Sequence, residues 1–147
     1  MIFAAGKGDA HAVVAWLDEG GGVDAGCPEK YGATLLMAAA AGGHEAMVRM
    51  LLQRGASVNL PNSNGITALM SAAIAGHTTT VQALLDAKAD ALLRGTNGKT
   101  ALMAADNFKH TEIGQLLRQH AKRQAAEAGA RAAASMVHAA AAADAMA

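Results

Sequence analysis

The stretch NGITALMSAAIAGH, residues 64–77, reads as a turn followed by a short helix, yet it contains no charged side chain. A helix on the surface of a globular protein normally has a polar face opposite its apolar one. This helix is small and apolar nearly all round, so we expect both of its flanks to be covered. The covering surface is found in the sequence itself, because the stretch is repeated.

Two further copies of the stretch occur at a spacing of 33 residues, YGATLLMAAAAGGH at residues 31–44 and NGKTALMAADNFKH at residues 97–110. The three copies share a glycine, a threonine, a leucine, a methionine and a closing histidine at aligned positions. The segment GDAHAVVAWLDEGGGVDA, residues 8–25, matches the second half of a further, degenerate unit. A period of this length is typical of repeat architectures.

Each copy has the chemistry of a turn followed by two helices. The glycine at positions 32, 65 and 98 stands where a tight turn needs a positive φ. The threonine two residues later can cap the first helix with its hydroxyl group. Alanines keep that helix thin, and a second helix follows with apolar residues on one face. Because one such pair cannot bury its own apolar surface, we expect the units to stack.

This order of residues resembles the ankyrin repeat, most closely in GATLLMAAAAGGHEAMVRMLLQRGASVN, residues 32–59. The resemblance covers roughly residues 3–120, about four units. It implies an all-α ankyrin-repeat solenoid of stacked helix-turn-helix units with β-turn tips. The predicted organisation is a degenerate N-terminal capping repeat at 1–30, repeats at 31–63 and 64–96, a C-terminal repeat at 97–122, and an Ala-rich helical or disordered tail at 123–147. We expect the last helix to continue to about Gly129.

Some positions depart from the family pattern. The family's first histidine is replaced in the three copies by Met37, Met70 and Met103, so flexible methionines fill the space of a Thr–His hydrogen bond. Lys88 and Ala121 stand where a glycine usually ends the second helix. A left-handed backbone at such positions is strained for residues other than glycine, which predicts lower or uneven stability.

Catalytic and metal sites are not expected. Successive units stack roughly 10 Å apart, too far for His44, His77 and His110 to share one zinc ion. The resemblance implies instead that each imidazole ties a turn to nearby backbone carbonyls. The GKT at residues 98–100 lacks both the earlier glycine and the buried strand of a phosphate-binding loop. We therefore predict a protein that is not an enzyme, with no catalytic residue, cofactor or metal.

The resemblance places a binding surface on the concave face, where the turn tips and the first helices are exposed. By register, Tyr31, Ile66, Ile74 and Phe108 form an apolar strip there, typical of a protein-binding patch. The alternative is that Ile74 and Phe108 pack against the next unit. The predicted partner-binding residues are Tyr31, Ala33, Ser63, Asn64, Ile66, Ile74, Asn97, Lys99, Asn107 and Phe108.

The predicted function is a non-catalytic protein–protein interaction module or scaffold, a subunit of a larger hetero-complex whose oligomeric state stays open. One alternative is a stoichiometric regulator of an enzyme, because the small ankyrin inhibitors of cyclin-dependent kinases resemble this chain in repeat number. The other is that the repeats are one module of a longer, multidomain protein. The partner's identity does not follow from the repeat pattern, because a fold does not fix a function.

Composition agrees with a protein partner. The net charge is zero, so nothing overall points to nucleic acid or an anionic membrane. No apolar run approaches the length of a membrane span, and the first ten residues lack the pattern of a signal peptide. Cys27 is the single cysteine, which excludes a disulfide framework within the chain. We therefore expect an intracellular, cytoplasmic location, with a nuclear or organellar assembly as the alternative.

Overall fold

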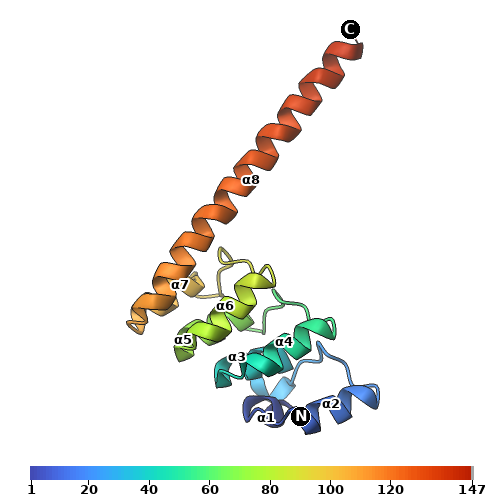
Figure 1. Cartoon of the computed structure of the whole chain (residues 1–147), viewed down its shortest axis with the longest axis vertical. Helices are drawn as coiled ribbons and strands as arrows, with labels where there is room; N and C mark the ends of the chain where they lie inside the picture. The colour runs from blue at the N-terminus through green and yellow to red at the C-terminus, as the bar shows by residue number, and fades with distance from the viewer. Residues whose placement is uncertain (147) are drawn as a thin grey trace.

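The computed structural model describes the backbone of residues 1–146 and the side chains of residues 1–134. Within these residues the chain is helical, with no strand longer than an isolated bridge between Cys27 and Ala33. The helices form four pairs: α1 (Ile2–Gly6) with α2 (Ala10–Asp18), α3 (Leu35–Gly42) with α4 (Glu45–Gln53), α5 (Ala68–Ala75) with α6 (Thr78–Asp86), and α7 (Ala101–Asn107) with α8 (Thr111–Met146). The pairs stack in chain order (Figure 1), which confirms the predicted all-α fold.

The ends of the first helices follow the predicted turn chemistry. Backbone N–H groups of the three repeated methionines donate to threonine hydroxyls, each over 3.3 Å; the caps are Thr34, Thr67 and Thr100. The C-cap residues of α3 and α5 are Gly43 and Gly76, whose φ angles are 72° and 81°. The repeated threonine and glycine therefore fix where these helices begin and end.

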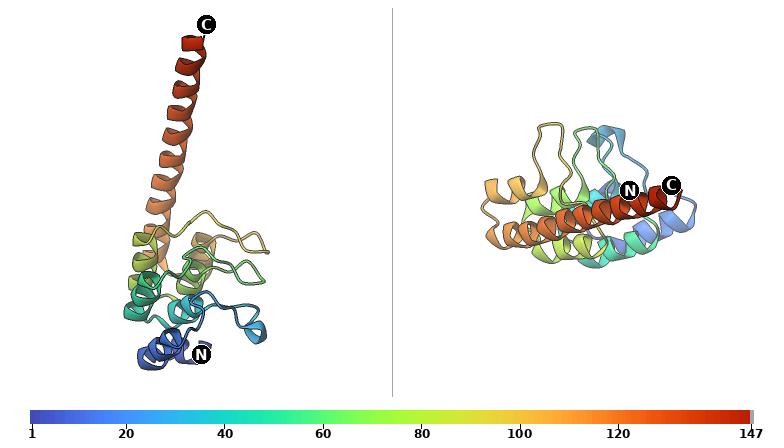
Figure 2. Two further views of the ribbon diagram at one scale, coloured as in Figure 1. Left: turned by 90° about the vertical axis from the view of Figure 1, so that its right-hand side faces the viewer. Right: turned by 90° about the horizontal axis from the view of Figure 1, so that it is seen from above.

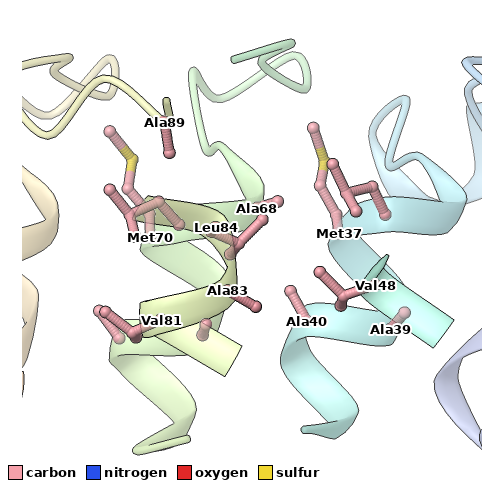
Figure 3. Close-up of a cluster of buried hydrophobic side chains, with 14 of the residues drawn as sticks. Met37, Ala39, Ala40, Val48, Ala68, Met70, Val81, Ala83, Leu84 and Ala89 are labelled. Atoms are coloured by element: carbon pink, nitrogen blue, oxygen red, sulfur yellow. The ribbon is translucent and has the colours of Figure 1, made fainter. Parts of the chain in front are cut away.

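The stack hides the uncharged stretch on both flanks. Among the first helices of the stack, α3 contacts both α1 and α5, and α5 contacts α7. Among the second helices, α6 contacts both α4 and α8. Ala68, Leu69, Ala72 and Ala73 are at most 1% exposed. Figure 3 shows the buried side chains of two successive units, in which Met37 and Met70 point the same way. Small side chains allow this close approach of neighbouring helices.

Three loops extend from one side of the stack as tips (Figure 2). Each tip is closed by a hydrogen bond from the N–H of its first residue to the carbonyl of its last: residues 27–33 (2.9 Å), 62–66 (3.0 Å) and 95–99 (3.0 Å). The first tip is two residues longer than the other two and contains the 3₁₀ turn η1 (Pro28–Lys30). Neighbouring tips are bonded to each other, because Ser63 N donates to Tyr31 O (2.8 Å) and Thr96 N donates to Asn64 O (2.9 Å).

The repeated histidines connect neighbouring units. Each Nε2 donates to a backbone carbonyl of the preceding unit: His44 to Gly6 (2.9 Å), His77 to Ala41 (3.0 Å) and His110 to Ile74 (3.1 Å). This confirms the structural role expected for these side chains. A Cβ atom on Gly43 would lie 2.6 Å from Nδ1 of His77. The glycine of one unit therefore leaves room for the imidazole of the next.

The expected end of the last helix near Gly129 is wrong, because α8 runs to Met146 and crosses the predicted boundary at 122/123 without interruption. In the preceding unit the chain turns after α6 at Lys88, which has a φ of 69°. At the equivalent Ala121 the helix simply continues. The residues that follow are mostly alanine, the strongest helix former, and a single interior glycine costs only about 1 kcal/mol. After its first turns, α8 extends away from the stack (Figure 1).

The side chain of Gln124 bonds α8 to the loop that follows α6. Gln124 accepts a hydrogen bond at Oε1 from Ala91 N (3.1 Å), and its Nε2 donates to the Asp90 carboxylate. In the units below, a similar bond joins successive loops, since Asn59 Oδ1 accepts from Asp90 N (2.7 Å). Gln124 therefore supplies from α8 the kind of hydrogen bond that the next loop supplies in the preceding units. No helix within the described residues is both long enough and apolar enough to cross a lipid bilayer.

Candidate protein-binding surface

The predicted binding residues lie on one side of the molecule, which we call the tip face. It consists of the three tips and the adjoining sides of α1, α3, α5 and α7. Two hollows open on this face. The N-terminal hollow lies between α1, α3 and the first tip and has a volume of about 470 Å³. The C-terminal hollow lies between α5, α7 and the third tip and has a volume of about 220 Å³.

The C-terminal hollow brings together six of the ten predicted residues: Ile66, Ile74, Asn97, Lys99, Asn107 and Phe108. Phe108 is 51% exposed and Ile74 is 38% exposed, so neither is buried against a neighbouring unit as the alternative required. The Phe108 ring stacks on the His110 imidazole at an interplanar angle of 16°, with 6.3 Å between the ring centroids. Because His110 is held by the carbonyl of Ile74, the aromatic wall of the hollow has a fixed support.

The other predicted residues lie elsewhere on the tip face. Ala33 lines the N-terminal hollow. Ser63 and Asn64 are exposed on the second tip, where their backbone groups hold the neighbouring tips. Tyr31 is 66% exposed and lines neither hollow, so the structure does not join it to the apolar residues of the C-terminal hollow.

The residues of α1 that line the N-terminal hollow were missed by sequence reasoning. Ile2 and Phe3 line it, and Phe3 is 69% exposed. A comparison at a spacing of 33 residues does not align α1 with the first helices of the other units, because the first tip is two residues longer than the other tips. A spacing of 35 aligns AAGKGD, residues 4–9, with AAAGGH, residues 39–44, and would have indicated a first helix here.

The hollows are apolar with a cationic border. Lys7 and Lys30 line the first hollow and Lys99 lines the second, whereas no acidic residue lines either one. The Lys30 Nζ atom lies 5.4 Å from the centroid of the Phe3 ring, within the range of a cation–π contact. The nearby Asp106 carboxylate forms an ion pair with Arg118 (2.8 Å). Such a surface can bind an apolar group next to a negative charge.

A family model described as "Ankyrin repeats (3 copies)" matches residues 1–94. Inversin from Danio rerio is 41% identical over 59 residues, which is 40% of this chain and 6% of that protein. Ankyrin repeat and SAM domain-containing protein 6 from Mus musculus is 52% identical over 42 residues, which is 29% of this chain and 5% of that protein. The chain therefore spans only a small fraction of the relatives that it matches.

The family match includes the first three helix pairs and the first two tips, and it covers more than half of the chain. The threonine caps, the glycine turns and the histidine contacts between units give the repeats their structure. The chain belongs to the ankyrin-repeat family.

Proposed function

We propose that this chain is a non-catalytic module that binds a protein partner through its tip face, as part of a larger assembly. Ankyrin repeats are generally protein-interaction modules. The observation that carries the proposal is the C-terminal hollow, in which two exposed apolar side chains from different units, Ile74 and Phe108, lie beside a lysine and two asparagines. Exposed apolar groups gathered in a hollow with a polar border are typical of binding hot spots.

The hydrogen bonds of the tips support this proposal. Each tip is closed by its own backbone hydrogen bond, and each is bonded to its neighbour. A surface that is already ordered loses little conformational entropy when it binds, so more of the contact energy is available for affinity. We also propose an intracellular location, which rests on the single Cys27.

The experiment begins with crosslinking mass spectrometry in native extract, which identifies the partner and the docking face together. The partner's affinity is then measured for the double variant Ile74→Asp, Phe108→Asp. We expect a loss of roughly tenfold or more, as for a hot-spot residue. Both side chains are exposed, so the variant should fold. The matched control is Leu92→Asp, which changes an apolar side chain that is 46% exposed and lines neither hollow. Equal affinity of the double variant and the wild type would rule out the tip face as the docking site.

A second proposal is that these repeats form one module of a longer protein. It is favoured by the short share of each relative that the chain matches, 6% and 5%. The apparent mass of the native protein on a blot, probed with antibody against this chain, tests it. A band at the mass of the 147-residue chain alone would contradict it.

A further inference from the structure

Each hollow of the tip face combines apolar walls with lysine. In the N-terminal hollow, Ile2 and Phe3 come from α1, and Lys7 and Lys30 come from two different segments of the chain. The Lys30 ammonium group lies over the edge of the hollow through its contact with the Phe3 ring. The cation is therefore placed next to the apolar surface while it stays exposed to solvent.

The C-terminal hollow repeats this combination in a different pair of units. Its apolar walls are Ile66, Ile74 and Phe108, and its cation is Lys99, which is exposed. Since the two hollows are separated by two steps of the stack, they lie roughly 20 Å apart. The two hollows use equivalent positions of the repeat, such as Ala38 and Ala104, but their phenylalanines, Phe3 and Phe108, do not occupy equivalent positions in their units.

The charged residues that line the hollows are all lysines although the chain as a whole is neutral; Glu29 is exposed on the first tip and Asp106 lies on α7, but neither lines a hollow. Three lysines and no acidic residue line the hollows, against 12 basic and 12 acidic residues in the chain. The helices α1, α3 and α5 carry no charged side chain. Between the hollows the second tip exposes only small polar groups, among them Ser63 and Asn64. Negative groups of a partner would therefore meet lysines at both ends and no repulsion between them.

We propose that the tip face binds an acidic protein segment with two large apolar side chains roughly 20 Å apart, one for each hollow. The inference rests on the proposed function of the tip face and specifies the chemistry of the partner. A span of 20 Å corresponds to about six residues of an extended segment or about 13 residues of a helix. The spacing of the two apolar residues therefore also reports the conformation in which the segment binds.

The test is selection from a random peptide display library on the purified full chain, with peptides of about 16 residues so that either spacing fits. We expect enriched peptides to carry an excess of Asp and Glu and two large apolar residues at one of the two spacings. Enriched peptides that are neutral or basic, or that depend on one apolar residue only, would overturn the proposal.

Charge reversal then tests the lysines with a defined probe, a synthetic copy of an enriched peptide. Lys30→Glu combined with Lys99→Glu should weaken its binding roughly tenfold at low salt, with the difference shrinking as salt is added. The matched control, Lys122→Glu on α8, should bind as the wild type does, because Lys122 lines neither hollow. A peptide with its acidic residues changed to Lys should bind the double variant better than the wild type. Equal binding by the wild type and the double variant contradicts the inference.

Two outcomes separate this inference from the proposed function. If the enriched peptides lose affinity for the Phe108→Asp variant but show no excess of acidic residues, the proposal of an acidic partner is contradicted and the tip face remains the binding surface. If no enriched peptide loses affinity for the Phe108→Asp variant or for the Phe3→Asp variant, both proposals fail. Circular dichroism of each variant shows whether the helices are intact, and because all five substituted residues are exposed, we expect that they are.

Discussion

At the scale of single residues, the neighbouring unit decides which side chain each position can hold. Gly76 has a φ of 81°, and a Cβ atom there would lie 2.6 Å from Cε1 of His110. The equivalent residue in the last unit is Lys109, which keeps the positive φ, at 61°. The histidine contact requires a glycine only where another unit follows, so the last unit can replace it at the cost of some backbone strain.

Thr80 is a residue whose chemistry conflicts with its place in the core. It is fully buried in α6, and its hydroxyl has no hydrogen-bond partner. The equivalent residues of the neighbouring units, Met47 and Ile113, are apolar and buried. Thr80→Val keeps the shape and removes the hydroxyl, so we expect the free energy of unfolding to rise by about 1 kcal/mol.

Urea denaturation measures the effect of Thr80→Val. The control is Thr79→Val, an exposed position of the same helix, where we expect a change within about 0.5 kcal/mol. A midpoint for Thr80→Val that equals or falls below that of the wild type would show that the hydroxyl has a partner in solution.

At the scale of elements, α8 differs from the other second helices because it continues where they end. Its first turns pack in the stack, with Ile113 and Leu117 at most 1% exposed. Beyond Ala121 it contacts the stack through Gln124, which satisfies the N–H of the buried Ala91. Helices of alanine are stable at this length, but their direction relative to the stack depends on tertiary contacts.

Gln124→Ala should therefore loosen the base of α8 without weakening the helix itself. Alanine has the higher helix propensity, while Ala91 N loses its hydrogen-bond acceptor. We expect the free energy of unfolding to fall by about 1 kcal/mol and amide exchange at Ala91 to accelerate. Gln119→Ala, at an exposed site of the same helix, is the control. Unchanged exchange at Ala91 would mean that Gln124 does not hold the loop.

At the scale of the whole molecule, stability comes from contacts between neighbouring units. The first helices form a continuous core, and a histidine joins each unit to the one before it. In such an array the units unfold together only as long as their interfaces are strong. The histidine contacts should therefore contribute to cooperativity as well as to stability.

His77→Ala tests this contribution in the middle of the stack. The His77 side chain does not cap α6, so the substitution leaves the helix cap unchanged and removes the bond to the carbonyl of Ala41 together with the packing of the imidazole against Gly43. We expect the free energy of unfolding to fall by about 1 kcal/mol and the urea transition to become less steep. His11→Ala removes an exposed histidine outside this series and is the control. If His77→Ala and His11→Ala have the same urea midpoint, His77 does not couple its unit to the preceding one.

The repeated sequence by itself determined the stacked helical fold and the helix caps, and its resemblance to the ankyrin repeat implied the role of the histidines. These features depend on residues close in the chain or on one spacing repeated many times, so pattern reasoning finds them. The same register predicted an apolar strip of Tyr31, Ile66, Ile74 and Phe108, and the last three of these line the C-terminal hollow. Its role in binding stays a prediction.

Only the tertiary structure decided what each copy of the pattern exposes. Met37 and Met70 are 4% and 3% exposed, whereas Met103, in the same register position, is 43% exposed because no unit follows it. The N-terminal hollow forms because α1 and the first tip, which are separated in sequence by α2, meet against α3. Burial is a property of the neighbours in space, and a repeat pattern is the same whether or not a neighbour is present.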